Sequence, residues 1–296
     1  MFELVNGMMN FMVSLFAAGS LHTAAPASAD ALPIPHQVPG GIALVNAGYG
    51  INPPKVTFNN QPVMVVRTDP QKPWTAIVGI PLSQKAGDAT VKTGSRKTQI
   101  HISEQDYPEQ HLTVSKNQVN PSKEELERIN REAAQMNTIY KSFTPGKGWS
   151  PMAWPVAGPL SSQFGLRRFF NGEERNPHSG LDIAVPTGTP VMAPADGKVV
   201  LTGDFFFNGN AVFIDHGQGL ISMFCHLSSI EVKEGETISA GDRLGLSGAT
   251  GRATGPHLHW TISLNNARIN PLLMLSPWQA PGIDDLTNTQ PNGDES

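Results

Sequence analysis

The spacing of turn-forming residues constrains this fold more than any other feature of the sequence. The chain has 29 glycines and 25 prolines in 296 residues, and they separate short apolar runs along most of its length. Glycine and proline are unfavourable inside helices but mark the turns between strands. With 39% hydrophobic residues, the chain can also bury a sizeable core. We therefore predict a mainly β protein, long enough for two domains.

Two regions carry these β-rich runs. From Ile42 to about Val114 the runs are KVTF, PVMVVRT, WTAIVGI, ATVKTG and TQIHIS, which predict a small antiparallel sandwich or barrel. His101 and His111 lie far apart there without another cluster of ligand-type residues, so we interpret them as surface or packing residues. From Trp154 to Leu275 the runs VMAPADGKVVLTG, NAVFIDHG, LISMFCHL and HLHWTIS predict a second β domain.

One helix is predicted between the two regions. Ser122 and Glu125 have the spacing of a capping box. Apolar residues then recur at steps of three and four, namely Leu126, Ile129, Ala133, Met136 and Tyr140. Charged residues flank this narrow stripe, so we expect the helix to lie against one or both domains.

The first residues have features of an export signal. Phe11 to Leu21 is apolar but too short to span a bilayer, and Ala27-Ser28-Ala29 fits a cleavage pattern. The residues before the apolar run include Glu3 and lack lysine and arginine, which departs from the usual pattern. We predict an exported, periplasmic or envelope-associated protein without a stable membrane span in the mature chain. A net charge of -4 gives no argument for binding nucleic acid.

These observations divide the chain into six segments. The predictions are a signal peptide (1–29), a linker (30–41), an N-terminal β-rich domain (42–115), a helical connector (116–150), a second β-rich domain (151–276) and a disordered tail (277–296).

The second β region contains a candidate metal site. His178 and Asp182 occur as H-x-x-x-D, and His257 and His259 lie two residues apart in a predicted strand. Residues two apart on a strand project from one face, so one histidine can bind metal while the other faces substrate. A catalytic zinc ion needs three protein ligands and an open fourth position. Spacing alone leaves open whether these residues and His226 converge or are structural.

Two neighbouring residues have simpler interpretations. His216, in the sequence D-H-G, is interpreted as a structural residue at a strand end. Cys225 adjoins His226, but neighbours on a strand point to opposite faces, so we interpret it as a small buried residue rather than a nucleophile.

Six motifs in this region occur in a characteristic order: QFGLR, HSGLD, GTPVMAPADGKVV, GNAVFIDHGQGLISMFCHLS, VKEGETISAGDRLGLSGATG and TGPHLHW. From about Pro155 to Pro271 the chain resembles the lysostaphin/LytM family of zinc endopeptidases. The resemblance implies that residues 151–276 form a zinc peptidase catalytic domain, a β-sandwich or barrel-sandwich hybrid with an open groove. It also implies that His178, Asp182 and His259 bind one Zn²⁺ and that His226 and His257 are the remaining active-site histidines.

The resemblance implies a substrate class as well. The family cleaves the peptide crosslinks of bacterial peptidoglycan, either glycyl-glycine bonds or bonds from D-alanine to a diamino acid. The N-terminal β module and the helix are similar to those of exported proteobacterial members, which favours the D,D-endopeptidase activity. No H-E-x-x-H motif supplies a glutamate base, so His226 and His257 are expected to provide acid and base catalysis.

Other functions remain as alternatives. Family members that lack zinc ligands activate cell-wall amidases, but all three ligand positions are filled here. A biotinyl or lipoyl carrier is disfavoured because no lysine occupies a hairpin tip between its two half-barrels. The N-terminal module could instead be an interaction or adhesion domain. Alternatively, that module or the helix Ser122–Tyr140 could restrain the groove. The oligomeric state is not predicted.

Overall fold

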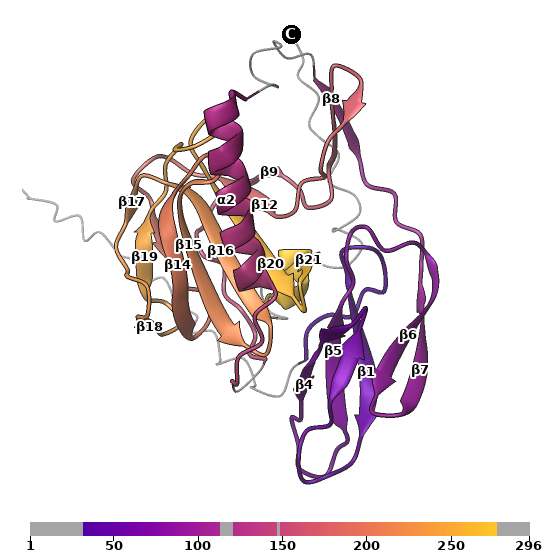
Figure 1. The fold of residues 1–296 in the computed structure, drawn as a ribbon. Helices are drawn as coiled ribbons and strands as arrows, with labels where there is room; N and C mark the ends of the chain where they lie inside the picture. Colours follow the sequence, from indigo (N-terminus) through magenta and orange to yellow (C-terminus); the bar gives the residue numbers. More distant parts are fainter. Residues whose placement is uncertain (1–31, 113–120, 147–148, 277–296) are drawn as a thin grey trace, which may run out of the picture.

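The computed structural model describes residues 32–112, 121–146 and 149–276. The predicted signal peptide and tail lie outside the described residues. The described chain is mainly β, with an N-terminal β domain, a larger C-terminal β domain and α2, the one α-helix of the described part (Figure 1). This confirms the predicted fold class.

The N-terminal domain is a sandwich of two antiparallel sheets. One sheet has the order β1-β5-β4, formed by β1 (Ile42–Gly48), β5 (Trp74–Gly79) and β4 (Met64–Val66). The other has the order β3-β2-β6-β7, formed by β3 (Gln61–Pro62), β2 (Val56–Phe58), β6 (Gly87–Thr93) and β7 (Arg96–Ile102).

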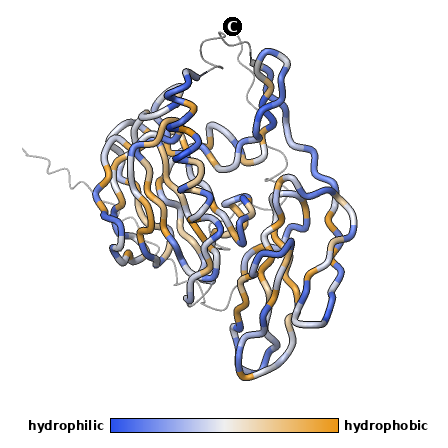
Figure 2. The backbone as a smooth tube through the Cα atoms, in the orientation of Figure 1, coloured by the Kyte–Doolittle hydropathy of each residue, from blue (hydrophilic) through white to orange (hydrophobic). Residues whose placement is uncertain are grey.

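The sheet β1-β5-β4 is buried on both faces. Val78 points into the sandwich core, where it joins Phe58 and Ile102. Its neighbour Ile77 points the other way, with Met64, into the core of the C-terminal domain. The alternation of side chains along a strand makes this possible, and it produces the continuous apolar runs seen in Figure 2. The two domains therefore share one hydrophobic cluster.

The C-terminal domain is built on an eight-stranded sheet with the order β18-β14-β15-β16-β20-β12-β9, in which β21 also pairs with β20. Its strands are β9 (Leu160–Ser162), β12 (Leu181–Ala184), β14 (Gly197–Phe205), β15 (Gly209–Gly217), β16 (Leu220–Leu227), β18 (Thr237–Ile238), β20 (His257–Leu264) and β21 (Ala267–Ile269). A second sheet, β13-β19-β17, comprises β13 (Pro190–Met192), β19 (Arg243–Leu246) and β17 (Ser229–Ile230).

The large sheet has one core face and one face that carries polar residues. Trp260 of β20 lies opposite Phe224 of β16, and both are fully buried in the cluster that includes Val191 and Leu244 of the second sheet. A short 3₁₀ helix, η1 (Pro271–Met274), packs into the same cluster. The residue pattern of this region did not predict a helix there.

Helix α2 (Lys123–Tyr140) covers part of the opposite face (Figure 1). The predicted capping box of Ser122 and Glu125 is confirmed. Tyr140 is buried against Phe213 and Met223, whereas the predicted stripe residue Leu126 is 45% exposed. No helix in the described part of the chain is both long and apolar enough to cross a membrane.

A third small sheet joins the two halves of the chain. Its order is β11-β10-β8, with β8 (Glu109–Leu112), β10 (Arg167–Phe170) and β11 (Glu173–Glu174), and β8 runs parallel to β10. The segment 32–41, expected as part of a linker, is also held between the domains. The amide of Ile34 donates to the carbonyl of Leu273, and the amide of Gly40 donates to the carbonyl of Ile80.

Candidate metal centre and active site

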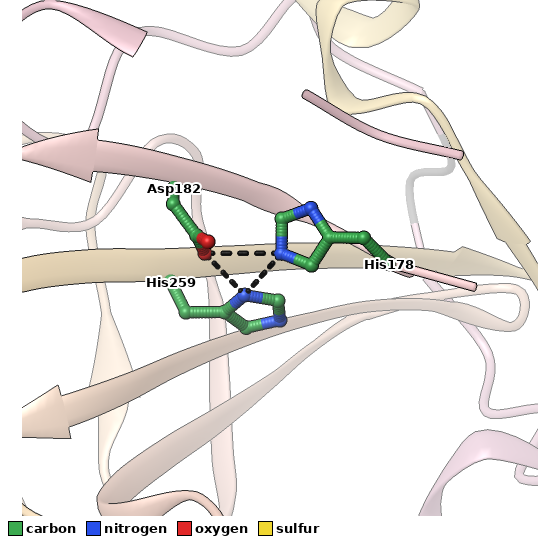
Figure 3. Close-up of side chains that lie close together, drawn as sticks. All are labelled: His178, Asp182 and His259. Atoms are coloured by element: carbon green, nitrogen blue, oxygen red, sulfur yellow. Dashed lines mark hydrogen bonds and ion pairs between the residues drawn. The ribbon is translucent and has the colours of Figure 1, made fainter. Parts of the chain in front are cut away.

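Three predicted ligands meet on the polar face of the large sheet. Asp182 of β12 is the cross-strand partner of His259 of β20, and His178 lies just before β12. Figure 3 shows the three side chains pointing toward one another. Asp182 Oδ1 lies 3.0 Å from His178 Nε2 and 2.7 Å from His259 Nδ1. The two ring nitrogens are 3.0 Å apart.

This geometry fits a metal ion. Ligand atoms about 2.0–2.1 Å from a tetrahedral zinc ion lie roughly 3.3 Å from one another, close to the observed separations. The other nitrogen of each ring is already held: His178 Nδ1 lies 2.7 Å from the carbonyl oxygen of Gln163, and His259 Nε2 lies 2.9 Å from Thr261 Oγ1. Such outer hydrogen bonds orient metal-binding histidines. The group could hold a metal ion.

The electrostatics agree with that fit. Burial alone would raise the pKa of Asp182, but the hydrogen bonds and charges of His178 and His259 outweigh it and hold that pKa well below its usual range. Burial lowers the pKa of His259, partly opposed by Asp182. Metal binding requires an ionised carboxylate and a neutral imidazole, and these are the forms favoured here.

His226 reaches the same face by an irregularity in β16. Asn210 of β15 pairs with Leu227, but Val212 pairs with Phe224, so two residues of β16 oppose one of β15. His226, the second of these two, has a positive φ of 62°. Strict alternation would direct His226 to the core face, opposite to Cys225. The bulge instead brings its ring 4.7 Å from that of His257, centroid to centroid.

Both of these histidines have one ring nitrogen fixed by the backbone. His226 Nδ1 lies 2.8 Å from the carbonyl oxygen of Thr250, and His257 Nδ1 lies 2.9 Å from that of Gly255. A carbonyl can only accept, so each Nδ1 carries a proton and Nε2 is the nitrogen left to face the site. His257 Nε2 is 3.7 Å from Asp182 Oδ1. Burial lowers the pKa of His226 to about 4, so this ring is neutral near pH 7.

Cys225 and His216 fit their structural interpretations. Cys225 is fully buried beside Phe213, where burial raises the pKa of its thiol to about 12. It therefore stays protonated. His216 lies at the far end of β15, with Nδ1 2.6 Å from the carbonyl oxygen of Asp196 and Nε2 2.8 Å from Ser222 Oγ.

His101 and His111, in the N-terminal half of the chain, are surface residues with 70% and 64% of their side chains exposed. Sequence reasoning missed Thr261, the partner of His259 Nε2. Its position two residues further along β20, on the same face, was the available signal.

The tip of the β14–β15 hairpin lies between α2 and the site. Buried Glu132 of α2 accepts a hydrogen bond from the amide of Phe206 (2.8 Å) and forms an ion pair with Arg128 (2.6 Å). The carbonyl of Asn208 at that tip accepts from the amide of His226 (2.8 Å). A buried glutamate within the helical stripe was not predicted from the apolar spacing. Through these contacts α2 supports the turn that holds His226.

Comparison with known proteins decides the family. The model of peptidase family M23 matches residues 176–271, and that of the family's N-terminal domain matches residues 35–105. A crystal structure of a putative M23 peptidase from Pseudomonas aeruginosa is 44% identical with a TM-score of 0.68, covering 82% of this chain and 96% of that one. The chain belongs to peptidase family M23.

Two curated M23 relatives match over shorter stretches. The peptidoglycan DD-endopeptidase ShyA of Vibrio cholerae is 46% identical over 112 residues, 38% of this chain and 26% of ShyA. The DD-carboxypeptidase/endopeptidase Mpg of Neisseria meningitidis is 40% identical over 118 residues, 40% of this chain and 27% of Mpg. The matches thus span about a quarter of the length of these two relatives.

Proposed function

We propose that this M23 protein is a zinc-dependent endopeptidase that hydrolyses the peptide crosslinks of bacterial peptidoglycan, with D,D-endopeptidase specificity. The convergence of His178, Asp182 and His259 on one point, with two more histidines beside it, carries the proposal. The family match and the names of ShyA and Mpg support the reaction and substrate class. The same relatives and the sequence of the leader support an exported, envelope-associated location.

His178 through Nε2, Asp182 through Oδ1 and His259 through Nδ1 would hold the zinc ion. When bound, zinc polarises the scissile carbonyl and makes its coordinated water acidic. Gln163 and Thr261 keep the two ligand rings in the required orientation.

The remaining two histidines handle the proton and the developing charge. His226 and His257 each present Nε2 on the site face, because their Nδ1 atoms are bound to backbone carbonyls. One ring accepts the proton of the attacking water at Nε2, and the other, protonated at Nε2, donates a hydrogen bond to the oxyanion. The neutral form of His226 near pH 7 suits the accepting role.

Product analysis tests this proposal. Purified protein is incubated with isolated peptidoglycan and with two defined substrates, a dimer with a D-alanyl–diaminopimelate crosslink and a pentaglycine peptide. Mass spectrometry should show cleavage of the first substrate, loss of cleavage with chelator and recovery with added zinc. Cleavage of the pentaglycine alone would reassign the specificity. Intact crosslinks with no bound zinc would instead support the amidase-activator alternative.

A further inference from the structure

Three arginines lie near one another beside the candidate metal centre. Arg168 of β10 places Nη2 3.8 Å from Asp182 Oδ2. Arg175 follows the β10–β11 hairpin, and its amide donates to the carbonyl of Arg168 (2.8 Å). Arg252 comes from the side of the site that holds His226, two residues after Thr250. The site is thus flanked by guanidinium groups on the Asp182 side and on the His226 side.

The position of Arg252 is fixed by the β14–β15 hairpin tip. Its amide donates to the carbonyl of Phe207 (3.0 Å), and its guanidinium carbon lies 4.4 Å from the centre of the Phe207 ring. Stacking on an aromatic ring holds a guanidinium in place without neutralising it. The pKa of Arg252 is lowered mainly by burial and further by the positive charges of Arg168 and Arg175. The three guanidinium groups are therefore close enough to repel one another.

These positive charges are only partly compensated. Within the described ranges no carboxylate forms an ion pair with Arg252. Arg175 pairs with Glu173 (2.7 Å), yet the Nε atoms of Arg168 and Arg175 are buried and make no hydrogen bond to any described residue. Three positive guanidinium groups therefore gather in a chain whose net charge is -4, and two of their N–H donors have no partner in the described part of the chain. This combination indicates a site for an anion.

We propose that Arg168, Arg175 and Arg252 form a carboxylate-binding subsite that recognises a free carboxylate on the carbon bearing the scissile amide nitrogen. This inference rests on the proposed function and specifies its substrate. Arg168 contacts Asp182, and Arg252 follows Thr250, whose carbonyl holds His226. The subsite therefore borders the space between the metal ligands and His226, where the scissile bond would lie. Guanidinium groups bind carboxylates through charge-assisted hydrogen bonds.

This chemistry distinguishes three crosslinks. In a D-alanyl–diaminopimelate crosslink, the carbon attached to the amide nitrogen carries a free carboxylate. In a crosslink to the side chain of lysine that carbon is a methylene without a carboxylate, and within a glycine bridge no such free carboxylate exists. The arginines would therefore select the direct diaminopimelate crosslink.

The test compares matched crosslinked dimers with zinc-loaded full-length protein. One dimer has the free diaminopimelate carboxylate at the scissile bond, a second is amidated there, and a third is amidated only at the isoglutamate carboxylate. The wild type should cut the first and third with a kcat/KM roughly 10- to 100-fold above the second, because the site's donors are left unpaired by the amide. The variants Arg252→Gln and Arg175→Gln should lose this preference while keeping bound zinc.

Arg243→Gln is the matched control, because Arg243 pairs with Glu231 through its Nε (2.6 Å) on a different sheet. This variant should keep the wild-type preference. Equal rates of the wild type on the first two dimers would overturn the subsite but leave the proposed function intact. A loss of rate on the third dimer alone would show that the arginines bind the isoglutamate carboxylate, which would overturn the proposed position of the subsite. If no dimer is cut, the proposed function fails, and equal affinity of wild type and Arg252→Gln for the free dimer would then overturn the subsite as well.

Discussion

The hairpin of β15 and β16 carries a histidine near each end, and the two ends differ in what the rings contact. At the closed end, His216 has a backbone carbonyl on one nitrogen and the Ser222 hydroxyl on the other. At the open end, His226 has a carbonyl on only one nitrogen, and its ring lies beside those of His257 and His259. Both histidines are partly or fully surrounded by protein and both have a lowered pKa. The number of ring nitrogens left free therefore separates the end proposed to be reactive from the structural end better than burial does.

Removal of a ligand should give the largest difference between the two ends. We expect His259→Ala to lose bound zinc and to reduce hydrolysis by on the order of 10³-fold or more. His216→Ala should retain one zinc per chain. Metal analysis of both purified variants, together with dimer hydrolysis, checks this. Full zinc occupancy in His259→Ala would show that Asp182 and the other histidines suffice.

The acid–base pair should have a smaller effect and a different signature. His226→Ala and His257→Ala should each keep zinc but lower kcat by about 10²- to 10⁴-fold, the usual contribution of a positioned proton-transfer group. Steady-state kinetics with measured zinc content separate this from ligand loss. Normal turnover by either variant would remove that residue from the mechanism.

The outer hydrogen bond to His259 should contribute less again. Thr261→Val keeps the shape of the side chain but deletes the partner of His259 Nε2. We expect zinc affinity to fall by roughly 10- to 100-fold, measured by competition with a chelator. Ser263→Ala, one position further along the same face of β20, serves as the control and should bind zinc as the wild type does. Equal affinity in all three proteins would exclude an orienting role for Thr261.

The smallest effect is expected at His216, and it concerns stability. Burial lowers the pKa of His216 in the folded state, so the unfolded chain binds the proton more readily. The contribution of His216 is therefore complete above its unfolded pKa of about 6.5 and is lost as the pH falls through the folded pKa. His216→Gln should weaken this acid dependence. Denaturant unfolding of metal-free protein across this pH range tests it, and parallel curves for wild type and variant would contradict it.

The sequence predicted the arrangement of the site only where side chains alternate regularly along a strand. Alternation along β20 correctly placed His257 and His259 on one face, and cross-strand pairing then brought Asp182 beside His259. The same alternation would direct His226 into the core. The bulge that turns it to the site, with its positive φ, leaves no mark in a run of apolar residues and so could not be predicted. For His226, the expectation came from the motif resemblance rather than from the spacing.

For the fold, the sequence predicted the individual elements but not how the domains pack. Turn spacing indicated two β domains, and the capping box marked the start of α2. The spacing did not reveal the packing between domains, because Ile77 and Val78 are equally apolar and nothing local shows that their two faces are buried by different domains. The roles of Glu132 and Arg252 likewise depend on partners about 75 and 45 residues away in sequence, Phe206 and Phe207.

The sheet that is buried on both faces also has a consequence for the order of synthesis. The N-terminal sandwich is made first, with Met64, Val66 and Ile77 forming an apolar face most of whose cover is encoded in residues 149–276. About 200 residues separate the end of β5 from the end of that cover, which takes about 10 to 40 s at roughly 5–20 residues per second. During that interval the nascent chain carries an uncovered hydrophobic surface. Its yield should therefore depend on how fast the second half is made and on what binds that surface meanwhile.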